Sequence, residues 1–537
     1  MNGFGGQYKP KKKINNSNFS KDQLMNQAFK FHSEGKILEA TKCYQHFINL
    51  GFEDHRLFYN YGVLLNSLGK LQEAESSYRK AIEINPNFAV AYYNLGSILK
   101  DLRKLKEAES SYSKAIEIKS DFAEAHLNLG SILKDLGKLQ EAESSYRKAI
   151  EINPNFAVAY YNLGSILKDL RKLQDAESSY SKAIEIKPNY AEAHLNLGSI
   201  LKDLGKLQEA ELSTRKALEI KSNYAEAHSN LGTILKDLGN LQEAEFSYRR
   251  AIEIKPNYAE AHSNLGTILI QKDLGKLQEA ELSYRKAIEL NPDLPLAHRE
   301  LGICLYLMGD TLSALDSIVK ANALDPKNIN NQLLLSIFQK EGNNTNRDIK
   351  TKKGKSNKIE ANLDSNPLIL DMPVEPELIS SLYKIKARDQ DIFQDPTYGN
   401  AKGSDYKLFE RSDPIIDKTK EKLTTILRDS VKSDILISAS FFTIFRSGGG
   451  LKSHDHLGSY DKLDGLNIAS KKFSLVYYLE VGDQNCDAPG ILKLENPNQD
   501  ILPSNGMIII FPAERKHSVF YKGEKDRIII GINFYSI

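Results

Sequence analysis

The feature that most constrains this sequence is a pattern that returns every 34 residues. Residues 123–143 recur without change at 191–211. A glycine marks the same place in successive copies, at positions 62, 96, 130, 164, 198, 232 and 266. Gly302 follows after 36 residues, because two extra residues stand near Ile270. A period of this length predicts a stack of similar units that bury one continuous core between neighbours.

Small and aromatic residues keep fixed distances within each copy. In one copy, Gly62 and Ala74 would let two helices approach closely, and Tyr78 would fill the gap between them. Pro86 would end the second helix. This pattern resembles the tetratricopeptide repeat, a helix–turn–helix unit. The resemblance implies an all-α superhelix over residues 21–336, with about nine repeats that start near residues 21, 55, 89, 123, 157, 191, 225, 259 and 295.

An asparagine stands two residues before each of the seven glycines, at Asn60, Asn94, Asn128, Asn162, Asn196, Asn230 and Asn264. In tetratricopeptide repeats this position faces the concave groove. The resemblance implies that a ladder of amides binds the backbone of a protein or peptide partner in that groove. The alternative is that duplication copied one asparagine, or that these amides tie adjacent repeats together.

Two basic stretches flank the predicted superhelix. Residues 1–20 contain lysines, no acidic residue and no apolar core of a secretory signal, so they predict a disordered basic arm. Residues 337–362 lose the apolar period and are rich in lysine, which predicts a flexible basic linker. The aromatic residues that usually accompany a nucleic-acid site are missing from residues 340–358.

The overall composition excludes several classes of protein. Because 72 Lys and Arg offset 70 Asp and Glu, the net charge of +2 argues against a nucleic-acid partner. Cys43, Cys304 and Cys486 are too far apart for a CxxC metal site and fit a reducing compartment, so we predict a cytoplasmic protein. No apolar run approaches the roughly 20 residues of a membrane span, so we expect no membrane partner. The sequence leaves the oligomeric state open.

The pattern changes after residue 363, from helical periodicity to short runs of β-branched and aromatic residues. Residues 376–387 and 413–431 read as helices, each with a proline near its first turn. Strands are predicted at 367–374, 435–446, 473–481, 490–496, 506–512, 517–521 and 527–535. We therefore predict a mainly-β domain over residues 363–537, a double-stranded β-helix (jelly roll) with supporting helices.

Three of the eleven histidines fall in this domain, all at the edges of predicted strands. His454 and His456 are two residues apart, so their side chains leave a strand on the same face. His517, from a distant strand, can complete a site for a transition metal. Arg527 begins the last predicted strand, where a guanidinium inside the barrel could bind a carboxylate through two hydrogen bonds.

With these residues identified, segment 435–537 resembles the iron(II)/2-oxoglutarate-dependent dioxygenases. The resemblance rests on H-x-H, SLVYYL, FP followed by HSV, and RIII, in that order. It implies that His454 and His517 bind Fe(II) and that Arg527 binds the distal carboxylate of 2-oxoglutarate. Of two adjacent tyrosines, one must face the barrel interior. We take Tyr477 as a cosubstrate-binding phenol, with core packing as its alternative.

One position departs from the family pattern. The family usually reads H-x-D, whereas the third residue here is His456, so the carboxylate ligand is missing from its expected place. We predict His456 as the third metal ligand. The alternatives are Asp455, which has the wrong strand parity, Asp461, or a site with two histidines and water.

Together, these patterns predict a protein-directed hydroxylase, in which the superhelix recruits a polypeptide and the barrel oxidises one of its side chains. A first alternative is a non-catalytic interaction scaffold with a degenerate, metal-free barrel, because the carboxylate ligand is missing. A second is a barrel that acts on a small molecule or sugar while the superhelix assembles complexes.

Overall fold

The computed structural model describes residues 20–348, 366–385, 401–403, 406–446, 448–457, 461, 466 and 468–537. The chain divides into two compact units, residues 1–256 and 257–537, each with its own internal packing. The predicted basic arm lies outside the described residues except for Ser20, whose side chain caps the first helix by accepting from the Gln23 amide (3.2 Å). The predicted linker lies outside them from residue 349 onwards.

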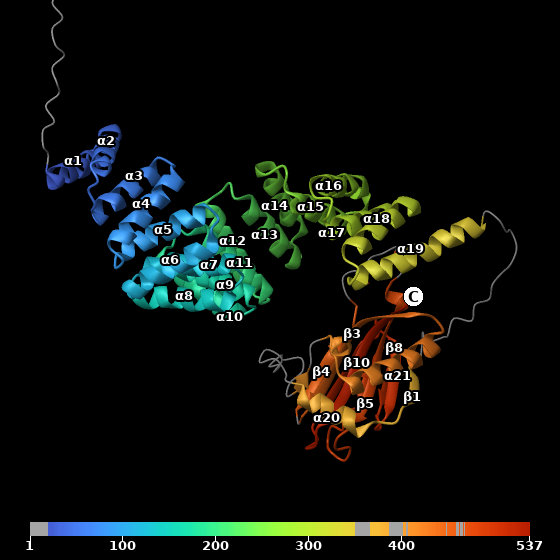
Figure 1. Cartoon of the computed structure of the whole chain (residues 1–537). Helices are drawn as coiled ribbons and strands as arrows, with labels where there is room; N and C mark the ends of the chain where they lie inside the picture. The colour runs from blue at the N-terminus through green and yellow to red at the C-terminus, as the bar shows by residue number, and fades with distance from the viewer. Residues whose placement is uncertain are drawn as a thin grey trace, which may run out of the picture. The chain divides into compact units, whose positions relative to one another are not determined.

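The first unit consists of helices joined by short turns, drawn in blue to green in Figure 1. The helices are α1 (Lys21–Ser33), α2 (Ile37–Asn49), α3 (His55–Ser67), α4 (Leu71–Ile84), α5 (Ala89–Asp101), α6 (Leu105–Ile118), α7 (Ala123–Asp135), α8 (Leu139–Ile152), α9 (Ala157–Asp169), α10 (Leu173–Ile186), α11 (Ala191–Asp203), α12 (Leu207–Ile220), α13 (Ala225–Asp237) and α14 (Leu241–Ile254). From α3 on, a helix of 13 residues alternates with one of 14. The predicted helix–turn–helix repeat is therefore confirmed.

A glycine and an aromatic ring hold the two helices of a hairpin together. A Cβ atom at Gly62 would lie 2.8 Å from the ring of Tyr78, and one at Gly164 would lie 2.9 Å from the ring of Tyr180. Both rings are fully buried. A larger residue at Gly62 or Gly164 would therefore push the helices apart, which explains why a glycine stands at this place in every unit except the first, which has Ala28.

The turn inside each hairpin contains a residue with left-handed backbone. Gly137 fills this place with φ of 76°, whereas Arg103 and Arg171 adopt φ of 60° and 62° at the equivalent turns. A residue with a Cβ atom pays roughly 1–2 kcal/mol for this conformation, and glycine does not.

We expect Arg103→Gly to raise the free energy of unfolding by up to about 1 kcal/mol, since relief of the backbone strain exceeds the extra freedom of glycine in the unfolded chain. Gly137→Arg makes the opposite substitution at the equivalent turn of the next hairpin, and it should lower the free energy of unfolding by a similar amount. Urea denaturation followed by circular dichroism measures both. Two changes of the same sign would contradict the explanation.

The second unit begins with the remaining helices: α15 (Ala259–Lys272), the 3-10 helix η1 (Leu274–Lys276), α16 (Leu277–Leu290), α17 (Pro295–Leu307), α18 (Thr311–Leu324) and α19 (Ile329–Asp348). The two extra residues lengthen α15 by one residue and add η1. Helix α19 ends later than the predicted linker boundary at residue 337. The apolar period ends there, but no proline interrupts the backbone hydrogen bonds before Asp348.

The rest of the second unit is rich in strands. Its elements are β1 (Leu368–Asp371), α20 (Pro376–Lys384), β2 (Ala401–Gly403), η2 (Leu408–Glu410), α21 (Pro414–Val431), β3 (Ile435–Phe445), β4 (Gly449–His454), η3 (Ala469–Lys471), β5 (Lys472–Glu480), β6 (Leu492–Leu494), β7 (Gln499–Ile501), β8 (Met507–Pro512), β9 (His517–Tyr521) and β10 (Arg527–Ser536). The strands form two antiparallel sheets, of order β1-β8-β5-β10-β3-β2 and β4-β9-β6-β7. Strands β2, β4 and β7 are missing from the sequence prediction because they are short and polar or rich in glycine.

The six-stranded sheet has a different core on each face. On one face, Leu382 of α20 and Leu423 of α21 pack with Ile530 of β10. On the other face, Phe511 and Ile529 pack with Val519 and other residues of the four-stranded sheet. The predicted helices thus cover one face of the large sheet (Figure 1), and its other face packs against the four-stranded sheet.

Candidate metal centre and ligand pocket

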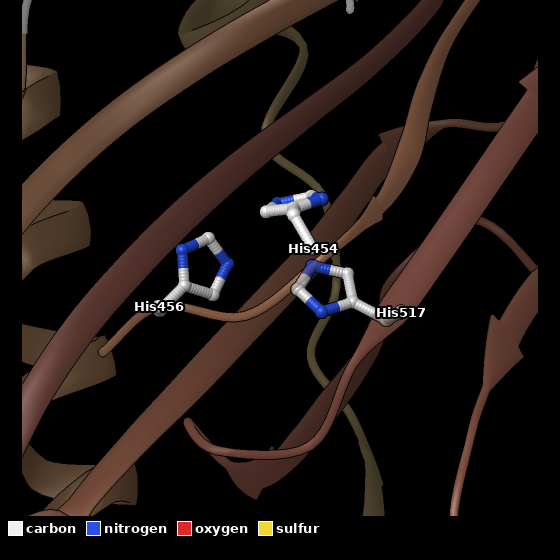
Figure 2. A group of neighbouring side chains, drawn as sticks. All are labelled: His454, His456 and His517. Atoms are coloured by element: carbon white, nitrogen blue, oxygen red, sulfur yellow. The ribbon is translucent and has the colours of Figure 1, made fainter. Parts of the chain in front are cut away.

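Three histidines come together between the two sheets. His454 ends β4 and His517 begins β9, and their Cα atoms are register partners. His456 follows β4, where its backbone N–H donates to the Ala513 carbonyl (2.9 Å). One ring nitrogen from each histidine lies within 4.8 Å of the others, and Figure 2 shows the three rings grouped together. This arrangement offers three nitrogen ligands to one metal ion.

The protein keeps two of these imidazoles, His456 and His517, in the form that binds metals. Burial, followed by the neighbouring histidines, lowers the pKa of His517 to about 3. Burial, followed by the charge of His454, lowers the pKa of His456 to about 3 as well. Both rings are therefore neutral near pH 7, and a neutral imidazole carries the lone pair that a metal needs.

These pKa values predict a pH dependence of stability in the presence of a chelator. The unfolded state takes up protons on His456 and His517 near pH 6.5, whereas the folded state does so only near pH 3. We therefore expect the free energy of unfolding to fall as the pH drops from 6.5 towards 4. Denaturation at a series of pH values measures this fall, and it should be reduced in His456→Asn/His517→Asn, which carries neither titrating ring.

Neither alternative carboxylate joins the histidine cluster in the part of the chain that the structure describes. Asp455 lines the pocket that also contains the three histidines, and its Oδ1 accepts from the Leu457 amide (3.0 Å). Asp461 is 4% exposed and forms an ion pair with Lys472 (2.7 Å), and it accepts from the Tyr535 hydroxyl (2.9 Å). Asp461 is thus engaged elsewhere, which argues against it as a ligand.

Arg527 lies in the same pocket as the histidines, a cavity of about 210 Å³ between the sheets. Its side chain is 1% exposed, and its guanidinium carbon lies 5.0 Å from the ring centre of Tyr478. Nη1 donates to the Pro489 carbonyl (3.0 Å), whereas Nε and Nη2 have no hydrogen-bond partner among the described residues. A buried cation with two unused donors is suited to an anionic ligand.

Tyr477, which we predicted to bind the cosubstrate, lies outside the pocket, so that prediction is corrected. Tyr477 belongs to the core beneath the helices, where its hydroxyl donates to the carbonyls of Met372 (3.3 Å) and Pro373 (3.2 Å). Tyr478 points to the opposite face of β5 and lines the pocket beside Arg527. Because successive side chains of a strand point to opposite faces, Tyr478 faces the pocket and Tyr477 does not.

The predicted ladder of asparagines contains three kinds of side chain. Three of its members tie adjacent repeats together, because each donates through Nδ2 to a tyrosine hydroxyl 35 residues earlier at 3.1 Å: Asn94 to Tyr59, Asn128 to Tyr93 and Asn196 to Tyr161. Asn60 donates to the Arg56 carbonyl within its own helix (2.8 Å). The side chains of Asn162, Asn230 and Asn264 make no hydrogen bond with the described residues, and they lie 35 residues after Leu127, Leu195 and Ser229.

The comparison with family models concerns the helical repeats. A model described as tetratricopeptide repeat matches residues 89–122, 123–156, 157–190 and 225–258. A second model of that description matches residues 179–211, and one described as TPR repeat matches 62–102 and 269–309. These are tetratricopeptide repeats. Such repeats mark this part of the chain as a protein–protein interaction scaffold, with a protein or peptide as the class of partner.

Several solved structures are similar to part of the chain. YrrB, described as a TPR protein with an unusual peptide-binding site, is 27% identical over 35% of this chain and 95% of its own, with a TM-score of 0.29. MamA is 28% identical over 30% of this chain and 94% of its own, with a TM-score of 0.29. A tetratricopeptide repeat protein from Parabacteroides merdae is 20% identical over 47% and 98%, with a TM-score of 0.40. No curated protein matches the chain.

A search of the helices for membrane spans has a simple result. Among the described residues, none of the helices combines the length and the apolar character that crossing a bilayer requires.

Proposed function

We propose that the β-rich part of the second unit is an iron(II)/2-oxoglutarate-dependent oxygenase of jelly-roll type, and that the tetratricopeptide repeats recruit its polypeptide substrate. One observation carries the proposal: three imidazoles, each with one ring nitrogen within 4.8 Å of those of the other two, share a pocket with a buried, half-paired guanidinium. A metal site beside a carboxylate site is what a metal-binding dicarboxylate requires.

The residues present fit both groups. Imidazole nitrogens are ligands that iron accepts, and no further protein group is needed to hold a divalent ion in this cluster. The unused Nε and Nη2 donors of Arg527 match the two oxygens of a carboxylate. Three imidazoles add no charge of their own, so Arg527 and a divalent ion together favour a dianion.

The roles of the chain's own residues follow from their chemistry. When bound, iron(II) and 2-oxoglutarate would allow dioxygen to act as the oxidant: 2-oxoglutarate would give up two electrons and be cleaved to succinate and carbon dioxide, with one oxygen atom of O2 entering succinate and the other entering the hydroxylated substrate. His454, His456 and His517 would hold the ion, and Arg527 would fix the far carboxylate of the cosubstrate. The ring of Tyr478 lies beside the guanidinium and excludes water from it, which strengthens its attraction for an anion.

The test of this proposal is the formation of succinate. Purified full-length protein with Fe(II), 2-oxoglutarate and oxygen should form succinate, and substrate polypeptide should accelerate it. His454→Ala should abolish turnover, and Arg527→Met should weaken 2-oxoglutarate binding while the metal still binds. Absence of 2-oxoglutarate binding to the metal-loaded wild type would overturn the proposal.

Recruitment would use the asparagines that are not tied to tyrosines. The amides of Asn162 and Asn230 keep their hydrogen-bonding capacity for a peptide backbone, whereas those of Asn94 and Asn196 spend a donor on the neighbouring repeat. Asn94 and Asn196 occupy the same position in the repeat, so they serve as controls for Asn162 and Asn230.

A library of random peptides displayed on phage can test this difference. After selection on the wild type, we expect the selected peptides to bind Asn162→Ala/Asn230→Ala about 10-fold or more weakly, since two hydrogen bonds of about 1 kcal/mol each are lost. Asn94→Ala/Asn196→Ala should lower the stability of the array more than the affinity. Equal loss of affinity in both pairs would contradict this division.

A second candidate function is a non-catalytic scaffold, and one observation favours it. The cluster of potential ligands in the described residues contains no carboxylate, unlike the H-x-D pattern of the family. Metal analysis of freshly purified protein separates the two candidates. Stoichiometric iron that is lost in His517→Ala supports the oxygenase, and a metal-free wild type that also fails to take up Fe(II) supports the scaffold.

A further inference from the structure

Asn533 and Ser474 form a polar pair in the pocket that the metal and carboxylate sites leave unexplained. Asn533 lies on β10 six residues after Arg527, and alternate residues of this strand, including Ile529 and Gly531, line the pocket. Ser474 lies on β5 as the register partner of Asn533. Asn533 is 8% exposed and Ser474 is 2% exposed, so both polar groups are shielded from solvent.

The pair is arranged so that one donor remains unused. The Ser474 hydroxyl donates to Oδ1 of Asn533 (2.8 Å), which orients the amide. The Nδ2 group of Asn533 makes no hydrogen bond with the described part of the chain. Asn533 lines the pocket, so its unused donor is available to an oxygen atom of a ligand bound there.

Strand register places this pair at the metal end of the pocket. Ser474 is the register partner of Phe511 on β8, and the ring of Phe511 lies 5.0 Å from the ring of His517. Arg527 lies further along β10, beside Tyr478. The pocket therefore has two separate donor groups, one beside the histidines and one near its far end.

We propose that Asn533, oriented by Ser474, binds an oxygen at the 2-oxo acid end of the cosubstrate, and so selects 2-oxo acids over simple dicarboxylates. The inference rests on the proposed function, because it assigns a second binding group within the same pocket. Asn533 acts on the end of the molecule nearest the metal, and Arg527 acts on the opposite carboxylate. The two residues thus recognise opposite ends of one ligand.

Three small molecules separate these two roles. Pyruvate has the 2-oxo acid without the distal carboxylate, glutarate has two carboxylates without the oxo group, and 2-oxoglutarate has both. Their dissociation constants can be measured by calorimetry with the full-length protein loaded with Mn(II), in the absence of oxygen. Asn533→Ala should weaken 2-oxoglutarate and pyruvate by about 10- to 100-fold, the effect expected for a hydrogen bond to a charged acceptor, and leave glutarate unchanged. Arg527→Met should weaken 2-oxoglutarate and glutarate and leave pyruvate unchanged.

The orienting hydroxyl has a matched control. Ser474→Ala should weaken pyruvate in the same direction as Asn533→Ala, by a smaller factor. Ser438→Ala should not, because the Ser438 hydroxyl donates to the backbone carbonyl of Asn533 (3.0 Å) instead of to its amide. If 2-oxoglutarate and pyruvate bind Asn533→Ala as tightly as the wild type, the inference is overturned while the proposed function stands. If the wild type binds no 2-oxo acid, both are overturned.

Discussion

Alanine in place of Asp461 is expected to destabilise the β-rich part of the second unit by about 3–5 kcal/mol, the usual cost of leaving one charge of a buried ion pair without its partner. Asp461 is 4% exposed and Lys472 is 7% exposed, and their charged atoms are 2.7 Å apart. The Tyr535 hydroxyl also loses its acceptor. Hydrogen exchange of β5 and β10 in the full-length protein measures the loss.

Two controls isolate the buried charge. Asp461→Ala/Lys472→Met removes both charges, so it should regain much of the lost stability. Glu410→Ala breaks an exposed pair with Lys407 and should cost less than about 1 kcal/mol. If Asp461→Ala costs no more than Glu410→Ala, the ion pair does not stabilise the fold in the way proposed here.

Removal of His517 is expected to weaken the binding of Zn(II) and of Fe(II) by about 100-fold or more, since loss of a direct ligand should exceed the 10- to 100-fold cost of losing a residue that only supports one. His517 is 3% exposed and offers a ring nitrogen within 4.8 Å of those of His454 and His456. Competition with a chromogenic chelator measures the affinity, under anaerobic conditions for Fe(II).

A buried histidine of the repeats serves as the control for this variant. His194 is 9% exposed, and its Nε2 lies 3.0 Å from the Pro188 carbonyl. His194→Ala should leave the stoichiometry and affinity of metal binding unchanged. Equal losses in the two variants would show that metal binds elsewhere or that both changes unfold the chain.

The helical repeats could be predicted from the sequence because a period of 34 residues is a strong signal, and six of the units pack a glycine on a tyrosine as Gly62 packs on Tyr78. The three histidines could also be predicted, since strand ends with imidazoles are few in this sequence. The sequence also distinguishes the asparagines that tie repeats together from the others. A tyrosine occurs 35 residues before Asn94, Asn128 and Asn196 and is replaced before Asn162, Asn230 and Asn264.

The choice between Tyr477 and Tyr478 could not be made from the sequence. Strand β5 is buried on both faces, so the residues that precede the tyrosines, Leu475 and Val476, are both apolar although they point to opposite faces. The strand therefore lacks the alternation of polar and apolar residues that would show which tyrosine faces the pocket. The role of Asp461 was hidden for another reason. Its partners Lys472 and Tyr535 are distant in sequence, and only the fold brings them together.

The half-paired guanidinium of Arg527 affects how readily the protein is degraded. Since its Nε and Nη2 groups are buried without partners, the ligand-free state carries a penalty that any well-fitting anion removes. An anion that binds only the folded state raises the free energy of unfolding, and with it the melting temperature, with the logarithm of its concentration relative to its dissociation constant. The resistance of this domain to proteolysis would then rise with the concentration of the anion that Arg527 binds. The amount of the protein in a cell would therefore depend on how much of that anion the cell contains.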